Sequence, residues 1–224
     1  MKVRLLIQVL FVFFPWFLRR RILNVFFGFK IHKTAYIGKS IILAYKLEMG
    51  EFSRIGSLTF CKNIDALVLG NYSRIGTLNY ITGFSTRFKD FFSHRESRKC
   101  ELLVGDHSAI TSRHFIDCTD QIKIGRYTTV AGIRSQILTH SINLKENIQD
   151  CKPVEIGSYS FVGTNSVILP GSKFPDYCIL GAHSVLNKDF EEEACLYGGV
   201  PAKKVKELEK DSYKYFSRLT GFVS

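Results

Sequence analysis

Between residues 156 and 188 the chain places an apolar residue at every sixth position. Six residues share this phase: Ile156, Val162, Ile168, Phe174, Leu180 and Leu186. The position four residues further on is always small, with Ser160, Ser166, Ser172, Cys178 and Ser184. A period of six fits neither the 3.6-residue helix nor the two-residue strand. It predicts short straight segments joined by tight corners, stacked as parallel strands about 4.8 Å apart around an apolar column.

Two upstream blocks repeat at a spacing of twenty residues. Residues 49–56 recur almost unchanged as residues 69–76, and residues 104–110 recur as residues 124–130. We interpret each repeat as one three-sided coil of about 18 residues with two extra residues at a corner. One coil cannot bury its own inner face, so such coils are stable only as a stack. The sequence therefore predicts one elongated, mainly β domain over residues 31–190, with about seven coils.

The segment 1–30 precedes the repeats and is apolar and basic. Its stretch 5–18 is almost wholly apolar and is followed by three arginines at positions 19–21. Fourteen residues are too few to span a bilayer. The basic cluster also follows the apolar run, whereas in a cleavable signal it comes first.

We expect residues 15–27 of this segment to form an amphipathic helix. Trp16, Leu23 and Phe27 would then share an apolar face opposite the arginines, which is typical of a helix lying in a membrane interface. The alternative is a helix that caps the open end of the stacked coils. The first interpretation predicts peripheral membrane contact through residues 1–27, on the inner face of the cell membrane.

The repeat is interrupted twice and then ends. Residues 83–101 form a polar, aromatic loop, and residues 140–153 form a shorter excursion. Long loops on a rigid scaffold often carry binding functions. The segment 191–224 is rich in Lys, Glu and Leu, and we expect it to form a C-terminal helix that ends near Leu219.

Composition narrows the class of partner. The 224 residues carry a net charge of +11 and six cysteines. The cysteines show neither CxxC pairs nor metal-ligand spacing, so we expect reduced thiols in a cytoplasmic protein and no metal. No compact basic recognition element is visible, and we therefore expect no nucleic-acid partner. An anionic membrane surface and an anionic cofactor both explain the charge.

Three motifs in order give the chain a family resemblance. They are Ile137-Leu138-Thr139-His140, then Lys152-Pro153-Val154-Glu155-Ile156-Gly157 with Val162-Gly163 and Pro170-Gly171, and finally Gly199-Val200-Pro201-Ala202-Lys203. Over residues 31–205 the chain resembles the hexapeptide-repeat acyltransferases, in the branch of sugar and polysaccharide O-acetyltransferases. The resemblance implies a left-handed parallel β-helix, a triangular prism whose handedness the period alone does not show.

The resemblance also implies a general base and a reaction. In this family the histidine of the Thr-His motif, here His140, removes the proton from the acceptor hydroxyl. A group that titrates near neutral pH suits this step, because the oxygen loses its proton as it attacks the thioester. The expected reaction is direct transfer from acetyl-CoA to a saccharide in surface polysaccharide biosynthesis, without a covalent enzyme intermediate.

By the same resemblance, coenzyme A would lie between neighbouring prisms of a homotrimer. Gly163 and Ala182 would line the pantetheine arm, and Lys188, Lys203 and Lys204 would meet the phosphates. Asp117 would bind acceptor hydroxyls or orient His140, and Arg134 would contact an acidic acceptor. The apolar, Arg-rich N-terminus replaces the acceptor-binding helices of the sugar acetyltransferases, which favours a lipid-linked or nucleotide-linked saccharide as the acceptor.

Three other functions remain open at this stage. An N-acetyltransferase that acts on an amino sugar would use the same site. A zinc enzyme similar to the γ-type carbonic anhydrases would need three convergent histidines, but Lys145 stands where a partner of His140 is wanted. A non-catalytic trimeric scaffold is the third, because a fold alone does not determine a function.

Overall fold

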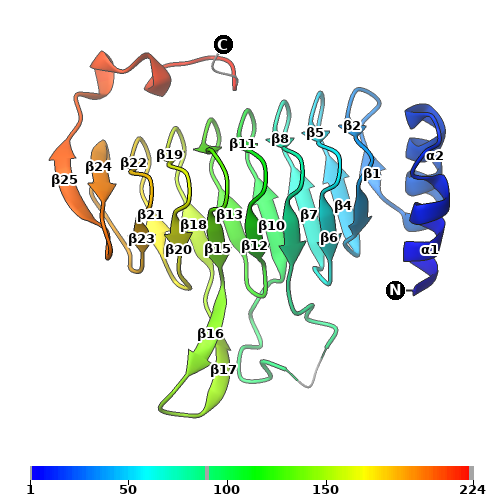
Figure 1. Ribbon diagram of the computed structural model, residues 1–224, viewed down its shortest axis with the longest axis horizontal. Helices are drawn as coiled ribbons and strands as arrows, with labels where there is room; N and C mark the ends of the chain where they lie inside the picture. The colour runs from blue at the N-terminus through cyan, green and yellow to red at the C-terminus, as the bar shows by residue number, and fades with distance from the viewer. Residues whose placement is uncertain (1, 89–90, 222–224) are drawn as a thin grey trace.

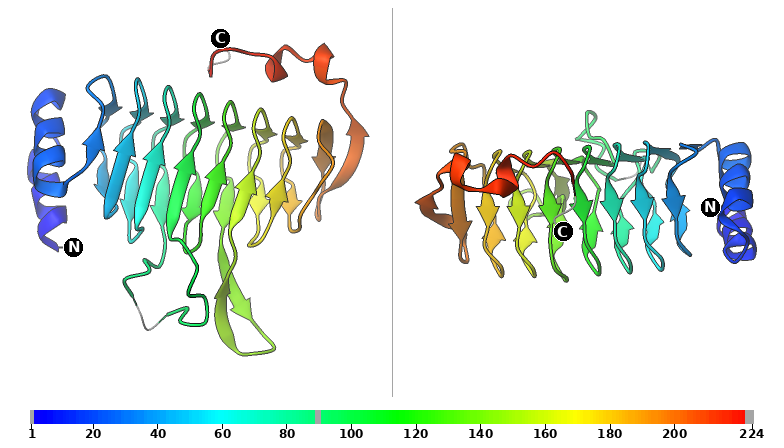
Figure 2. Two further views of the ribbon diagram at one scale, coloured as in Figure 1. Left: turned by 180° about the vertical axis from the view of Figure 1, so that it is seen from behind. Right: turned by 90° about the horizontal axis from the view of Figure 1, so that it is seen from above.

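The protein is a three-sided prism with a pair of helices across its N-terminal end (Figure 1). The computed structural model describes residues 2–88 and 91–221. The expected segments 1–30, 83–101 and 191–224 therefore include one, two and three residues outside the described part. Short strands stack along the long axis, and the C-terminal segment runs back along one edge (Figure 2). Two excursions leave the prism on one side.

Three sheets form the sides of the prism. Sheet A contains β1 (Lys30–Ile31), β4 (Lys46–Met49), β7 (Ala66–Leu69), β10 (Glu101–Val104), β13 (Ile122–Ile124), β18 (Val154–Ile156) and β21 (Lys173–Phe174). Sheet B contains β2 (Tyr36–Ile37), β5 (Arg54–Ile55), β8 (Arg74–Ile75), β11 (Ala109–Ile110), β14 (Thr129–Val130), β19 (Phe161–Val162), β22 (Ile179–Leu180), β24 (Cys195–Gly198) and β25 (Lys203–Glu207). Sheet C contains β3 (Ile41–Leu43), β6 (Phe60–Lys62), β9 (Tyr80–Thr82), β12 (Phe115–Asp117), β15 (Gln136–Leu138), β20 (Val167–Ile168) and β23 (Val185–Leu186).

The strands of each side pair in parallel from one coil to the next, except that β25 runs antiparallel to β24. Outside the prism, β16 (His140–Asn143) and β17 (Ile148–Cys151) form an antiparallel hairpin. We call the three edges the AB, BC and CA corners after the sheets that they join. The predicted parallel β-helix is confirmed, and the structure is consistent with the left-handed coil that the resemblance implies.

The six-residue period corresponds to the inner face and the corners. The apolar phase is buried throughout, from Ile156 to Leu186. The small phase lies at the corners, where Ser166 Oγ donates a hydrogen bond of 2.9 Å to the Gly163 carbonyl. A Cβ on Gly163 would lie 2.6 Å from the backbone nitrogen of Ala182 in the next coil. Glycine is therefore required here by the close stacking of the corners.

An aromatic ladder follows the AB corner. Its rings stack with centroids 4.7–5.2 Å apart, and its members are Phe52, Tyr72, His107, Tyr127, Tyr159 and Tyr177. Each member has a positive φ, because the corner turns through the left-handed region. Offset stacking of this kind adds to the pairing of the strands beneath it.

The prediction of a C-terminal helix that ends near Leu219 is wrong. The tail instead contains β25 and two short 3₁₀ helices, η1 (Lys210–Ser212) and η2 (Lys214–Phe216). Pairing with β24 satisfies backbone groups at the end of sheet B, and Phe216 packs edge-on against Tyr177 of the ladder. These tertiary contacts outweigh the helix propensity of the segment.

Two helices rather than one form the N-terminal segment: α1 (Lys2–Phe11) and α2 (Trp16–Phe27), separated at Pro15. The helices close the open end of the prism. Gln8 exchanges two hydrogen bonds with the backbone of Ile42, at 2.5 and 2.8 Å. Arg19 donates to the carbonyls of the first BC corner, including that of Gly38.

The prediction that Trp16, Leu23 and Phe27 face a membrane is also wrong. Leu23 and Phe27 are buried against the first coil, and the Trp16 indole donates a 2.9 Å hydrogen bond to the Ala35 carbonyl. This face of α2 is therefore the cap. Within residues 2–88 and 91–221, no helix is long and apolar enough to cross a bilayer.

Replacing Gln8 with alanine should lower the free energy of unfolding by about 1–3 kcal/mol, because the buried N–H and C=O groups of Ile42 lose their partners. Urea denaturation would measure the change. Val9→Ala, at the exposed neighbouring position of the same helix, is the control. Equal midpoints for the two variants would contradict the capping role of Gln8.

Candidate functional site

Both excursions leave the prism at the CA corner. The loop begins at Gly83, directly after β9. The hairpin begins at His140, and Thr139 alone separates it from the end of β15. In sheet C these strands are separated only by β12. The two excursions therefore extend side by side from one edge (Figure 1).

A carboxylate and an imidazole form a dyad at this corner. His140 Nδ1 lies 2.5 Å from Asp117 Oδ2. Asp117 ends β12 and pairs with Leu138 of β15, so the register of the sheet brings the two side chains together. Asp117 is 2% exposed, whereas the His140 side chain is 33% exposed. The carboxylate is thus inaccessible and the imidazole is open to solvent on one side.

Further hydrogen bonds hold the Asp117 carboxylate in place. Thr119 donates to Oδ1 from its hydroxyl at 2.7 Å and from its N–H at 3.2 Å. The N–H groups of Thr139 and His140 donate to Oδ2 at 3.2 and 3.3 Å. Burial works to raise the pKa of Asp117, but the hydrogen bonds from His140, Thr119 and Thr139 outweigh it, and the net pKa lies below its usual value. Asp117 is therefore an ionised acceptor at neutral pH.

The dyad determines which nitrogen of His140 is available. The hydrogen bond to Asp117 raises the pKa of His140, and partial burial opposes this rise. Because an ionised carboxylate can only accept, the neutral imidazole carries its proton on Nδ1 and its lone pair on Nε2. Among the described residues, Nε2 has no hydrogen-bond partner. It is placed to accept a proton from a bound molecule.

Aromatic rings from the loop flank the imidazole. The ring centroids of Phe84 and Phe92 lie 5.7 and 6.1 Å from that of His140, both nearly edge-on. They form an apolar wall on one side of the imidazole. Water is partly excluded there, which strengthens the electrostatic interactions of the dyad.

Charged contacts attach the loop to the hairpin and to the dyad. Arg95 makes a bidentate ion pair with Asp150 of β17, at 2.6 and 2.7 Å, and its guanidinium lowers the pKa of Asp150. Buried Arg98 donates to the Thr119 carbonyl at 2.9 Å and also to that of Phe84. The loop thus reaches the residues that hold Asp117.

A cavity of about 460 Å³ lies beside the hairpin. It is lined by Ser141, Asn143, Asp150, Cys151, Lys152, Leu169, Pro170 and Asn187. Its volume is within the range of small-molecule sites. His140 is not among its lining residues, but Ser141, the next residue of β16, is.

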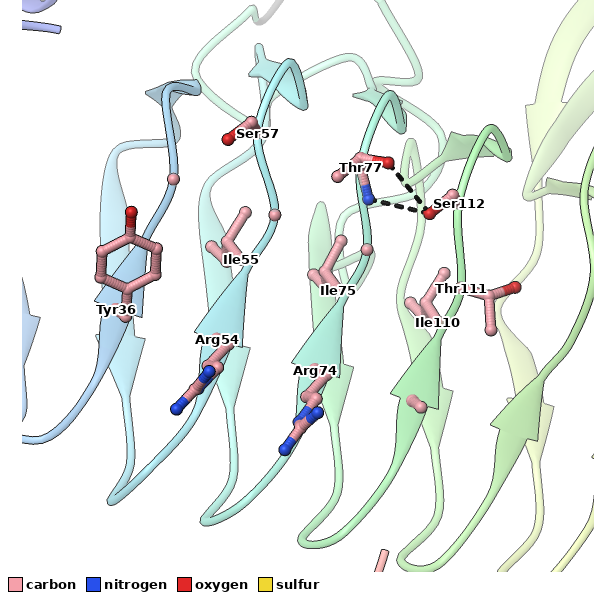
Figure 3. A pocket seen from close by; sticks show the side chains of 14 residues that line it. Tyr36, Arg54, Ile55, Ser57, Arg74, Ile75, Thr77, Ile110, Thr111 and Ser112 are labelled. Atoms are coloured by element: carbon pink, nitrogen blue, oxygen red, sulfur yellow. Dashed lines mark hydrogen bonds between the residues drawn. The ribbon is translucent and has the colours of Figure 1, made fainter. Parts of the chain in front are cut away.

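A second cleft of about 460 Å³ lies on the outer face of sheet B, away from the CA corner (Figure 3). Arg54 and Arg74 occupy paired positions on β5 and β8 and point the same way. Thr77 donates to Ser112 Oγ from its N–H and hydroxyl at 3.0 and 3.1 Å. The cleft is on a different side of the prism and is separate from the dyad.

The other residues predicted from the sequence do not meet His140 within one chain. Gly163, Ala182 and Arg134 lie at the BC corner, across sheet C from the dyad. Lys188 follows β23 at the CA corner, with Nζ 5.2 Å from the centroid of the Phe190 ring.

Lys203 and Lys204 begin β25 at the far end of the prism. Lys203 is exposed. Lys204 forms ion pairs with Glu192 and Glu207, at 2.5 and 2.8 Å. Of the two, Lys203 is the freer cation.

The described part of the chain, residues 2–88 and 91–221, contains no cluster of three His, Cys, Asp or Glu side chains that could hold a metal ion. The ring of His114 is buried between coils, where its Nδ1 accepts from the Ser135 N–H, and burial lowers its pKa to about 4. His140 is bound by a carboxylate rather than by further histidines.

Parts of the chain match curated acetyltransferases. Over 76 residues it is 30% identical to a putative acetyltransferase of Staphylococcus aureus (strain COL), covering 33% of this chain and 38% of that protein. Over 65 residues it is 32% identical to the galactoside O-acetyltransferase of Escherichia coli (strain K12), covering 29% and 32%. Over 117 residues it is 33% identical to protein CapG of Staphylococcus aureus, covering 49% and 63%. The chain thus spans less than two thirds of each of these relatives.

Two solved structures share the fold over most of the chain. The polysialic acid O-acetyltransferase OatWY aligns with 80% of this chain and 84% of its own, at a TM-score of 0.57 and 20% identity. The N-acyltransferase AntD of Bacillus cereus, in complex with dTDP-4-amino-4,6-dideoxyglucose and coenzyme A, aligns with 87% and 90%, at a TM-score of 0.50 and 15% identity. No protein-family model matches the chain.

The chain resembles the hexapeptide-repeat acetyltransferases. The resemblance predicted from its motifs is confirmed by the partial sequence matches and by the shared fold. Sequence reasoning predicted His140 as the base and gave Asp117 two possible roles, and the structure brings these two side chains together. It did not predict the contacts of Phe84, Phe92 and Arg95. Their signal was the common origin of both excursions after strands of sheet C.

Replacing Asp117 with asparagine should lower the pKa of His140 toward the ordinary histidine value, because the charge that raises it is removed. NMR titration of the imidazole protons would measure the shift. Asp150→Asn is the control, since Asp150 contacts His94 and Arg95 rather than His140. An unchanged titration in Asp117→Asn protein would mean that the dyad does not form.

Proposed function

We propose that this protein is a coenzyme-A-dependent acyltransferase that O-acetylates a saccharide, with His140 as the general base. The observation that carries the proposal is the dyad, in which Asp117 fixes the imidazole and leaves Nε2 open. The curated matches to acetyltransferases support the reaction class. The cavity lined by Ser141, the residue after His140, is the proposed place for a substrate group.

The dyad suits direct acyl transfer. Nε2 removes the proton from the acceptor hydroxyl as its oxygen attacks the thioester carbonyl of acetyl-CoA. Asp117 stabilises the imidazolium formed in this step without itself taking the proton. When the carbon–sulfur bond breaks, the imidazolium returns a proton to the thiolate, giving an acetyl ester and free coenzyme A. General-base assistance of this kind contributes about 10²–10⁴-fold to the rate.

The proposed binding site for coenzyme A requires a second copy of the chain. Gly163 and Ala182 lie at the BC corner and His140 at the CA corner, so one prism presents the two sets on opposite edges of sheet C. In a cyclic homotrimer, the CA corner of one copy can face the BC corner of the next. Lys188 and Lys203 would then meet the phosphates, whereas the two ion pairs of Lys204 make it a weaker candidate.

The proposed acceptor is a saccharide. Among the relatives, the galactoside O-acetyltransferase and the polysialic acid O-acetyltransferase carry sugar acceptors in their names. Arg134, at the BC corner, would contact an acidic group of the acceptor. Transfer to the amine of an amino sugar would use the same base, and the fold shared with an N-acyltransferase keeps this as the second candidate.

Replacing His140 with alanine should reduce kcat for acetyl transfer by about 10²–10⁴-fold, because the base is lost. Affinity for coenzyme A, measured by calorimetry, and the oligomeric mass should not change. His32→Ala, at the AB corner of the N-terminal end of the prism, is the matched control. Normal turnover by His140→Ala protein would remove the catalytic assignment and favour a scaffold role.

The pH profile tests the same assignment in the native protein. His140 must be neutral to accept a proton, and its pKa is raised by Asp117. The value of kcat/KM should therefore fall as the pH drops through this raised pKa, which lies above the ordinary histidine value of about 6.5. In Asp117→Asn protein the acid limb should move to lower pH. An acid limb that stays in place would show that another group is titrating.

A further inference from the structure

The helix pair α1–α2 presents apolar side chains both toward the prism and away from it. Its polar side chains Gln8 and Arg19 are buried against the first coil, where they bind backbone groups. Large apolar side chains point away from the protein instead. Six of them, each 59–77% exposed, define what we call the outer cap face: Leu6, Leu10, Phe13, Phe17, Val25 and Phe26.

This arrangement differs from that of a helix on a water-exposed surface. Such a helix buries its apolar stripe and turns its polar side chains outward. Here the apolar side chains on the inner face, Leu23 and Phe27, complete the core, while a second apolar set stays exposed. Within this second set, the centroid of the Phe13 ring lies 5.2 Å from Lys39 Nζ. Phe17 and Phe26 are nine residues apart on α2 and so lie on its two flanks. Exposed apolar surface on this scale is typical of an interaction site.

Charge indicates what covers the outer cap face. The first acidic residue of the chain is Glu48. Before it stand nine basic residues, namely Lys2, Arg4, Arg19, Arg20, Arg21, Lys30, Lys33, Lys39 and Lys46. Lys2, Arg21 and Lys33 are exposed. Arg4 and Arg19 turn inward, and Lys30 and Lys46 pair with Glu48, but Lys39 Nζ lies 5.2 Å from the centroid of the Phe13 ring. Exposed apolar side chains with basic side chains beside them and no acidic residue on either helix match an anionic lipid surface, whereas a second copy of the same cap would bring like charges together.

We propose that the outer cap face docks the protein end-on onto an anionic phospholipid bilayer. The exposed phenylalanines enter the boundary between headgroups and acyl chains, and the basic side chains lie among the headgroups. The helices form a layer across the end of the prism, perpendicular to its long axis (Figure 2). The prism therefore stands away from the membrane surface.

Docking in this way places the dyad of Asp117 and His140 at a defined height above the membrane surface. From β3, beneath the cap, to β15, which precedes His140, sheet C advances four strands. At the spacing of paired strands this is about 20 Å, and the helix layer adds about 10 Å. If the proposed acyl transfer is correct, a lipid-linked acceptor in the same membrane must carry an extended saccharide that reaches this height.

Vesicle flotation with the full chain tests the docking. The protein should float with vesicles of phosphatidylglycerol and phosphatidylcholine, and less with phosphatidylcholine alone. The triple variant Leu6→Ser, Phe17→Ser and Phe26→Ser should bind the vesicles at least roughly tenfold more weakly. The reason is that three apolar side chains that would enter the bilayer are lost. Removing residues 1–21 would be a poorer test, since it also removes Gln8 and Arg19 from the cap.

A matched control carries the same changes elsewhere. Leu144→Ser, Val205→Ser and Leu219→Ser replace equally exposed apolar side chains outside the cap. This variant should float like the wild type, and thermal melting should show that both triple variants are folded. Equal flotation of the two variants, or no flotation of the wild type, would overturn the proposal.

The end-on orientation of the protein on the membrane is tested by a separate measurement. The six native cysteines are buried, so an introduced surface cysteine can be labelled selectively. An environment-sensitive fluorophore on Phe26→Cys should shift to the blue on anionic vesicles, whereas one on Leu144→Cys, at the hairpin tip, should not. A shift at both positions would overturn the end-on orientation.

Sedimentation without lipid tests whether a second copy of the chain covers the outer cap face instead. If the cap variant lowers the oligomeric mass and leaves vesicle binding unchanged, a second copy covers the face and the membrane proposal fails. None of these measurements depends on catalysis. Loss of acetyl transfer in His140→Ala protein with normal flotation would separate the two proposals, as would normal transfer by a protein that does not float.

Discussion

The structure depends on the in-register stacking of short coils. Each coil buries its inner side chains only against the coils above and below it, so residues one coil apart become neighbours. Asp117 and His140, 23 residues apart, meet for this reason. A shift of one residue between β12 and β15 would turn every side chain of the strand to the other face and separate the dyad.

The regular part of the chain could be predicted because every coil needs the same residue types at the same positions. An apolar residue must point inward and a small one must stand at each tight corner, so the period from Ile156 to Leu186 predicted the fold. The Thr-His motif identified His140. For Asp117 the sequence left two roles open, because the ends of strands can point either way. Burial to 2% exposure favours orientation of His140 over contact with an acceptor.

The irregular parts were unpredictable because their contacts follow no period. Arg95 and Asp150 are 55 residues apart and meet only after both excursions leave the same corner. The tail has helical composition, yet its aromatic residues pack on the ladder at the AB corner, which no single segment encodes. Periodicity in α1 and α2 likewise defines two faces of a helix but does not say which one faces the protein.

The cap and the proposed membrane anchor are therefore two sides of one layer rather than alternatives. The first coil of a β-helix presents backbone groups without a preceding strand, and these must be satisfied. In this mostly apolar helix pair, Gln8 and Arg19 turn inward and donate to these groups. Their inward direction forces apolar side chains outward. The opposite end of the prism is closed by the Lys-rich strand β25, so the two ends differ in polarity and the molecule has a direction along its axis.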